Sequence, residues 1–243
     1  MNTCPGKLNS INAKEISKLL QNMGDKEDAR FLQGFFKTGK GQYGEGDIFL
    51  GIRVPATRKL AKEYNNLPLK EISVLLKSPY HEVRLFALIS LVNTFDKGDE
   101  TIQKKIYDLY LANTNYINNW DLVDVSAPNI VGAYLFTRSR KLLYQLGRSK
   151  SLWERRIAVL ATFYFIKNNQ FDDSLKIAGI LLQDKEDLIH KASGWMLREI
   201  GKRDIKVAKI FLQKHCRIMP RTMLRYAIER FAPSKRHMYL KCR

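Results

Sequence analysis

Residues 152–158 read Leu152-Trp153-Glu154-Arg155-Arg156-Ile157-Ala158, and their pattern recurs along the chain: a polar or charged turn, a basic residue, then a small residue. Similar stretches contain the small residues Ala87, Ser193 and Ala227. With Ala158, these positions are 71, 35 and 34 residues apart, and 71 is two periods of about 35. A further copy is therefore expected near residues 119–123.

A period of about 35 residues is typical of stacked helix pairs, in which each unit buries its apolar face on the next. Apolar residues recur at spacings of three and four, as in Ile16, Leu19 and Leu20, whereas alternating strand patterns are weak. We therefore predict an all-α fold, a HEAT-like repeat solenoid built as an α-α superhelix. No linker divides the chain, so we predict a single domain over residues 1–243.

Five glycines interrupt the repeat between Thr38 and Gly51. A phosphate-binding loop would need Gly-Lys-Ser/Thr at the start of a helix that follows a strand. Here Gly39-Lys40-Gly41 is followed by Gln42, and no strand precedes it. We predict instead a connection whose glycines adopt positive φ.

The charge is strongly positive, with 42 Lys and Arg against 24 Asp and Glu and a net charge of +18. Basic residues cluster near the repeat turns, which stack along one edge of a solenoid. A solvated helix face usually mixes both signs, so this imbalance favours a stripe that follows a phosphate backbone. Representative positions are Arg53, Arg58, Arg138, Arg140, Arg148, Arg155, Arg156, Lys191, Arg198, Arg217 and Arg225.

Other classes find no support in the sequence. The N-terminus lacks the apolar core of a secretory signal, and the longest apolar run, residues 157–166, is too short to cross a bilayer. Cys4, Cys216 and Cys242 are odd in number and lack metal-ligand spacing, so we expect neither a disulfide framework nor a zinc site. We expect a cytoplasmic monomer without metal, cofactor or membrane contact.

Two of the three tryptophans lie beside charged residues at helical spacing. Trp120 lies four residues before Asp124, so both share a helix face, and Trp195 lies three before Arg198. Either tryptophan alone is more typical of a core. The Asp124 carboxylate shares a helix face with Trp120 in a chain that is otherwise strongly basic. An acid there weakens binding to a polyanion, so its presence indicates a chemical role. Asp121 has a simpler explanation as a first-turn acid on the helix dipole.

Three segments resemble the signature segments of the AlkD-type DNA alkylation-repair glycosylases: Asn119–Asp124, Leu152–Ala158 and Lys191–Glu199. Phe49–Pro55 and Leu224–Glu229 extend the likeness over nearly the whole chain. The resemblance implies a solenoid whose concave basic face holds duplex DNA. It also implies hydrolytic excision of N3- and N7-alkylated purines that carry a positive charge.

The resemblance further implies roles for individual residues. Asp124 corresponds to the catalytic carboxylate, Trp120 and Trp195 to aromatics that press on the deoxyribose, and Arg156 and Arg198 to arginines that hold the DNA backbone. Phe31 falls where the family has a tyrosine near the lesion, so the ring is kept and the hydroxyl lost. Lys191 and Arg155 are also expected to bind DNA.

The chemical properties of these residues agree with this reaction independently of the resemblance. A cationic alkylpurine is already a good leaving group, so the barrier lies in the positive charge that develops on the sugar. One carboxylate can stabilise that charge, and indole faces favour a cation. We expect Arg156 and Arg198 to keep Asp124 ionised. The alternatives are a non-catalytic HEAT-repeat module that binds nucleic acid or an acidic protein, which has no use for Asp124, and, more remotely, a small-molecule enzyme.

Overall fold

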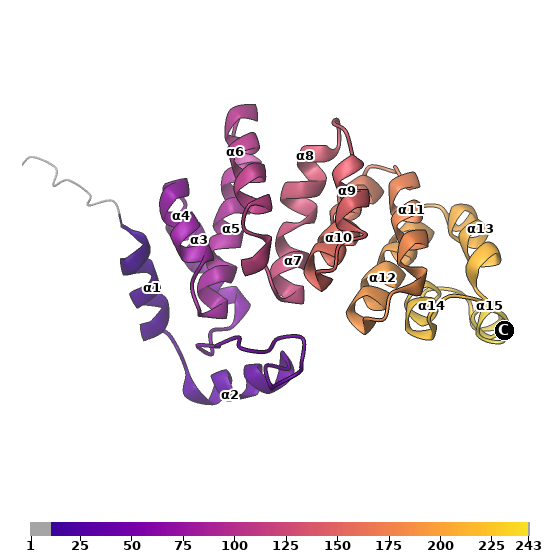
Figure 1. The fold of residues 1–243 in the computed structure, drawn as a ribbon, viewed down its shortest axis with the longest axis horizontal. Coiled ribbons are helices and arrows are strands. Elements are labelled where there is room, and N and C mark those ends of the chain that lie inside the picture. Colours follow the sequence, from indigo (N-terminus) through magenta and orange to yellow (C-terminus); the bar gives the residue numbers. More distant parts are fainter. Residues whose placement is uncertain (1–10, 243) are drawn as a thin grey trace, which may run out of the picture. The chain divides into compact units, whose positions relative to one another are not determined.

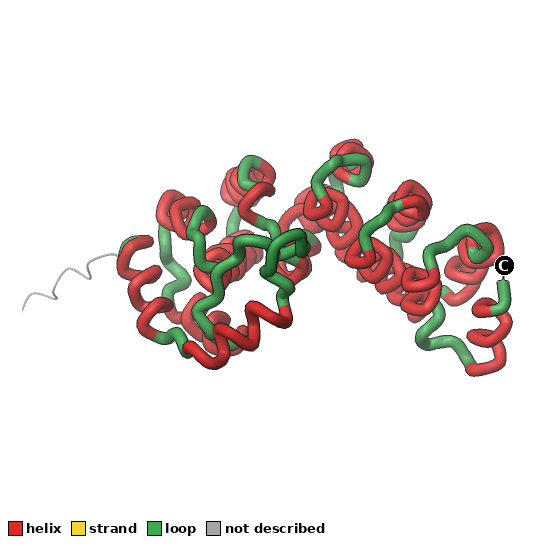
Figure 2. The backbone as a smooth tube through the Cα atoms, turned by 60° about the horizontal axis from the view of Figure 1, so that its bottom comes forward, coloured by secondary structure: helices red, strands yellow, loops and turns green. Residues whose placement is uncertain are grey.

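The computed structural model describes residues 11–242, and all regular structure within them is helical (Figures 1 and 2). One isolated bridge joins Ile48 and Tyr80 without forming a strand. The all-α prediction is thereby confirmed. The chain divides into two compact units, residues 1–98 and 99–243, and each is described below by itself. The single domain over 1–243 and the concave basic face remain predictions.

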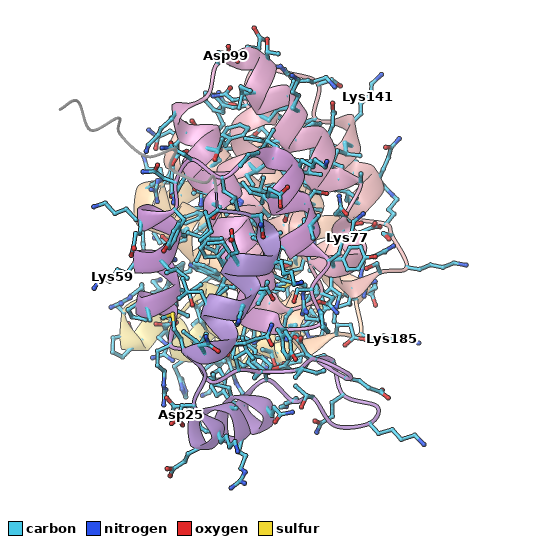
Figure 3. The ribbon with its side chains drawn as sticks, turned by 90° about the vertical axis from the view of Figure 1, so that its left-hand side faces the viewer. Asp25, Lys59, Lys77, Asp99, Lys141 and Lys185 are labelled. Carbon is cyan, nitrogen blue, oxygen red and sulfur yellow. A yellow bond between two sulfur atoms is a disulfide. The ribbon has the colours of Figure 1, made fainter. Side chains whose placement is uncertain are left out.

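The first unit contains α1 (Ala13–Asn22), α2 (Lys26–Phe35), α3 (Val54–Glu63), α4 (Leu69–Leu76) and α5 (His81–Lys97). α5 is buried over most of its length and packs against α3 and α4. α2, in contrast, has no buried residue. Lys59 and Lys77 are exposed and extend away from the helices (Figure 3).

The glycine-rich connection joins α2 to α3. Gly41, Gly46 and Gly51 have φ values of 75°, 80° and 87°, so the predicted positive-φ loop is confirmed. At Gly51 a Cβ would lie 2.0 Å from the Asp25 carbonyl oxygen, so only glycine fits there. The Glu82 carboxylate accepts hydrogen bonds from the backbone N–H groups of Leu50, Gly51 and Ile52, which fixes the end of the loop on α5.

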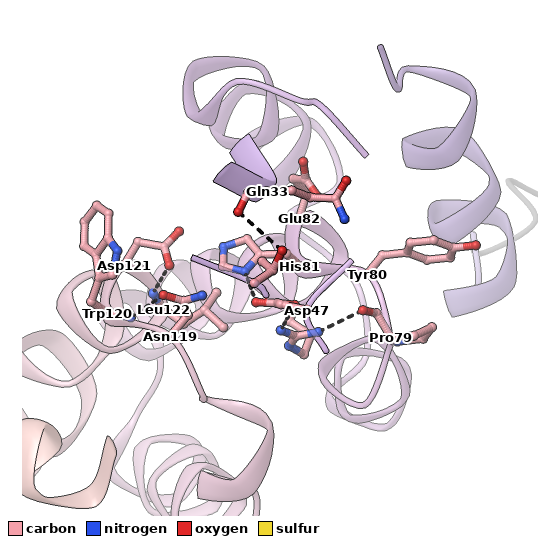
Figure 4. Close-up of polar contacts among 12 residues, drawn as sticks. Gln33, Asp47, Pro79, Tyr80, His81, Glu82, Asn119, Trp120, Asp121 and Leu122 are labelled. Atoms are coloured by element: carbon pink, nitrogen blue, oxygen red, sulfur yellow. Dashed lines mark hydrogen bonds and ion pairs between the residues drawn. The ribbon is translucent and has the colours of Figure 1, made fainter. Parts of the chain in front are cut away.

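A buried carboxylate fixes the middle of the same loop. Asp47 accepts hydrogen bonds from His81 Nδ1 at 2.8 Å and from Arg84 Nη2 at 2.6 Å (Figure 4). Arg84 also donates to the carbonyl oxygens of Ser78 and Pro79 just before α5. These contacts lower the pKa of Asp47, although burial alone would raise it.

The second unit holds the longer run of helices. Its elements are α6 (Glu100–Leu111), η1 (Thr114–Tyr116), α7 (Trp120–Ser126), the π-helical turn η2 (Pro128–Gly132), α8 (Ala133–Leu135), α9 (Lys141–Leu146), α10 (Leu152–Lys167), α11 (Asp172–Ile180), η3 (Leu181–Gln183), α12 (Asp187–Arg203), α13 (Ile205–His215), α14 (Arg221–Ala227) and α15 (Pro233–Leu240). Lys141 and Lys185 of this unit also project into solvent (Figure 3).

The predicted repeat is visible in this unit. α10, α12 and α14 begin at Leu152, Asp187 and Arg221, which are 35 and 34 residues apart. α10 packs against α12, and α12 against α14, with the small residues Ala158, Ser193 and Ala227 buried. α7 begins at Trp120, where the further copy was expected. The repeat prediction is therefore confirmed for these helices.

The cysteine prediction is wrong for one pair. Cys216, at the end of α13, and Cys242, just after α15, form a disulfide with their Cα atoms 6.1 Å apart. The two cysteines are 26 positions apart, and the chain between them turns back through α14 and α15, a return that sequence spacing alone does not reveal. Cys4 lies outside the described residues. No described helix combines the length and apolar character needed to cross a bilayer.

Candidate functional site

The start of α7 carries two of the predicted site residues. The Asn119 side chain caps the helix by accepting a hydrogen bond from the Trp120 N–H at 2.9 Å (Figure 4). Asp121 stands in the first turn, where the helix dipole favours an acid, and accepts from the Leu122 N–H. Trp120 and Asp124 follow on one helix face, one turn apart, and both are partly exposed.

Asp124 forms a two-point ion pair with Arg156 of α10. Arg156 Nε donates to Asp124 Oδ1 at 2.9 Å, and Nη2 donates to Oδ2 at 2.8 Å. The third guanidinium nitrogen, Nη1, donates to the Leu188 carbonyl oxygen in the first turn of α12 at 2.6 Å. The Arg156 side chain is 6% exposed and that of Asp124 is 19%. One guanidinium thus joins α7, α10 and α12 beneath a carboxylate that still reaches solvent.

The charge state of Asp124 reflects two opposed effects. Burial raises its pKa, while the charge and hydrogen bonds of Arg156 lower it, and burial prevails, so the pKa lies above the ordinary aspartate value. Arg156 therefore acts in the expected direction without restoring an ordinary pKa. Arg198 does not contribute as expected, because its guanidinium lies against Glu229 and Glu199 rather than Asp124.

Trp195 lies on α12, seven residues beyond Leu188, or about 10 Å along the helix axis. Its neighbour Gly194 brings α12 close to α14: a Cβ there would lie 2.5 Å from the Met223 carbonyl oxygen and 2.6 Å from Tyr226 Cβ. The indole contacts the ring of Phe163 at 5.7 Å between centroids. Its Nε1 donates a hydrogen bond to Glu199 Oε1 at 3.2 Å.

The predicted DNA-binding cations of this unit already have acidic partners. Arg155 pairs with Asp184 at 2.6 Å and donates to the Ser149 and Lys150 carbonyl oxygens. Lys191 pairs with Asp187 at 2.8 Å, and Arg198 forms an ion pair with Glu229. DNA binding by Arg155, Arg156, Lys191 and Arg198 remains a prediction.

Phe31 belongs to the first unit, so the structure does not place it relative to Asp124. It lies on α2, is 59% exposed, and stacks against Phe35 with 6.3 Å between ring centroids. The Arg53 guanidinium lies 5.5 Å from its ring centroid. An exposed aromatic ring beside an arginine suits contact with a nucleic acid, and this role is likewise still a prediction.

The sequence reasoning missed Glu199, although its signal was present. Glu199 lies four residues after Trp195, the spacing at which two side chains meet on a helix. It also missed Asp184 and Glu229 as partners of the predicted basic residues, because each is about 30 residues away along the chain. No three His, Cys, Asp or Glu side chains within residues 11–242 lie close enough to share a metal ion.

The family assignment rests on nearly the whole chain. A family model described as DNA alkylation repair enzyme matches residues 16–231. The chain belongs to this family. The resemblance carried by the three signature segments is thus confirmed at the level of the family.

Two solved structures share the fold. A protein described as a predicted DNA alkylation repair enzyme from Enterococcus faecalis has a TM-score of 0.67 and 18% identity, and the match covers 86% of this chain and 97% of that one. AlkD2 from Streptococcus mutans has a TM-score of 0.52 and 18% identity, covering 91% and 100%. No curated protein matches the sequence. At this identity the likeness establishes the helical repeat fold of the family.

Proposed function

We propose that this protein is a DNA glycosylase that excises cationic N3- and N7-alkylated purines, such as 3-methyladenine and 7-methylguanine, from duplex DNA. The observation that carries the proposal is the Asp124 carboxylate, fixed by Arg156 and sharing a helix face with Trp120. Membership in the DNA alkylation repair family supports it. We further propose that it acts as a monomer in the cytoplasm, without a cofactor.

The chemistry follows from the charge of the substrate. The bond between sugar C1′ and the purine nitrogen breaks, the purine leaves as a neutral base, and positive charge develops on the sugar. Asp124 stabilises this charge and orients the water that adds to C1′, and the proton that this water loses passes to the solvent. The indoles of Trp120 and Trp195 offer electron-rich faces to the same cation, each contributing about 0.5 to 2 kcal/mol.

Arg156 serves this chemistry by holding Asp124 in one orientation. Two parallel hydrogen bonds to a guanidinium fix the plane of a carboxylate better than a single contact does. The third bond, to Leu188, fixes the guanidinium itself. A preorganised carboxylate does not need to reorient as the sugar gains charge. The free energy of that reorientation is therefore not added to the barrier, which is how electrostatic catalysis speeds a reaction.

Asp124→Asn tests the proposal directly. The variant keeps the shape of the side chain and removes its charge, so base release should fall about 10²- to 10³-fold. Binding to methylated duplex DNA should be equal or slightly tighter, because repulsion between Asp124 and phosphate is relieved. The measurement is single-turnover release of free base at saturating protein, with DNA affinity measured separately.

The neighbouring ion pair offers a matched control. Asp184 is paired with Arg155 much as Asp124 is paired with Arg156, and both arginines lie on α10. Breaking either pair leaves an arginine without its carboxylate, so Asp124→Asn and Asp184→Asn should both lower the thermal unfolding temperature. Only Asp124→Asn should remove base release. Equal losses from both variants would mean that Asp124 acts through folding.

The reaction products distinguish the class of glycosylase. Hydrolysis by water leaves an intact strand with an abasic site, so we expect strand breaks only after alkali treatment. Breaks without alkali would contradict the monofunctional mechanism. Tight DNA binding by a folded wild-type protein that releases no base would instead favour the non-catalytic module.

A further inference from the structure

Trp195 has one polar atom, and that atom has a specific partner. The indole N–H can only donate, and it donates to Glu199 Oε1 at 3.2 Å. The ring also contacts Phe163, 5.7 Å away between centroids. Since Trp195 is only partly buried, packing covers only part of the ring. A hydrogen bond at the indole edge and a ring contact together fix its plane.

Glu199 is itself held firmly. Its side chain is 9% exposed, and its Oε1 lies 2.6 Å from Lys202 Nζ and 3.7 Å from Arg198 Nε. Its Oε2 lies 3.9 Å from Arg203 Nη1. These three cations surround the carboxylate, so the acceptor offered to the indole has little freedom to move.

We propose that Glu199 is a positioning residue that sets the orientation of the Trp195 indole toward the substrate. The proposal rests on the proposed function, because it concerns the aromatic face offered to the sugar cation. It assigns Glu199 no contact with DNA. A cation near an indole is stabilised only over the ring face, so rotation of the ring weakens the interaction without changing the residues present.

Two substitutions separate positioning from charge. Glu199→Gln keeps an oxygen that can accept from the indole but loses the charge that pairs with Lys202. Glu199→Met has a side chain of similar length, but it loses both the acceptor oxygen and the negative charge. If Glu199 positions the indole, Glu199→Gln should retain most base release, whereas Glu199→Met should lose it roughly tenfold. The affinity for DNA should be equal or tighter in both variants, because the negative charge that offsets Arg198, Lys202 and Arg203 is removed.

The decisive measurement is a double-mutant cycle with Trp195→Phe, which keeps a ring and removes the indole N–H. Glu199→Met should slow single-turnover base release roughly tenfold in the wild-type background and less than about twofold in Trp195→Phe. An equal loss in both backgrounds would overturn the proposal. If the Met variant does not fold, Glu199→Asp replaces it, since its shorter side chain withdraws from the indole and keeps the charge.

A second readout does not depend on activity. The indole N–H signal of Trp195 can be assigned by its absence from the NMR spectrum of Trp195→Phe. In Glu199→Met this signal should shift and exchange faster with water, and in Glu199→Gln it should stay protected. Unchanged protection in Glu199→Met would overturn the role of Glu199. A wild-type protein without base release would overturn the proposed function alone.

Discussion

At the residue scale, the candidate site is one carboxylate and the guanidinium that holds it. The spacing of Trp120 and Asp124 could be read from the sequence, because four residues form one helical turn. The pairing of Asp124 with Arg156 could not, since these residues are 32 positions apart and meet only when α7 packs against α10. The raised pKa of Asp124 was missed for the same reason: burial is a property of the packed helices.

The raised pKa leads to a prediction about pH. Base release needs the ionised carboxylate, so its rate should fall as pH drops through the pKa of Asp124, which lies above the ordinary value of about 3.9. Arg156→Met removes the charge that lowers this pKa, so the midpoint should move to higher pH. Single-turnover rates between pH 4 and 8 measure it, with circular dichroism at each pH as the control. An unchanged midpoint in Arg156→Met would contradict the assignment.

At the element scale, the repeat helices depend on small residues where they cross. The period predicted α10, α12 and α14 from the small residues Ala158, Ser193 and Ala227, which are buried, and α7 from the double gap between Ala87 and Ala158. The π-helical turn at Pro128 and the disulfide of Cys216 and Cys242 had no such periodic signal, since each depends on one local path of the chain.

Gly194 tests the crossing of α12 and α14. Gly194→Ala places a Cβ 2.5 Å from the Met223 carbonyl oxygen, so α12 and α14 must shift apart, at a cost of about 1–3 kcal/mol in the free energy of unfolding. Gly179→Ala on α11 is the matched control, because its Cβ would meet nothing within 4 Å, and should stabilise the protein by about 0.5–1 kcal/mol. Urea unfolding measures both. Equal effects would show that helix propensity alone is at work.

At the scale of the whole molecule, many basic side chains pair with acids inside the protein, although the net charge stays at +18. Many residues of the predicted basic stripe pair with acids, among them Arg138, Arg140, Arg155, Arg156 and Arg198. The composition correctly showed the excess of positive charge. It could not show which cations are already paired, because the acids that pair with them lie about 30 to 40 positions away along the chain.

Binding to duplex DNA should nevertheless depend strongly on salt. Each phosphate neutralised contributes about −0.9 to the slope of log K against log salt concentration. We expect a steep slope and little difference between DNA sequences, measured by fluorescence anisotropy on two unrelated duplexes. A nearly flat plot, or no binding at low salt, would contradict DNA as the partner.

The hydrogen bond from Arg156 to the Leu188 carbonyl oxygen affects which residues can change together in related proteins. The guanidinium that orients Asp124 also ties α10 to α12, so loss of the aspartate leaves a buried cation without its counterion. We therefore expect a related protein that has lost Asp124 and the reaction to have replaced Arg156 as well. Replacement of both Asp124 and Arg156 is therefore the sequence change that would identify a family member without this activity.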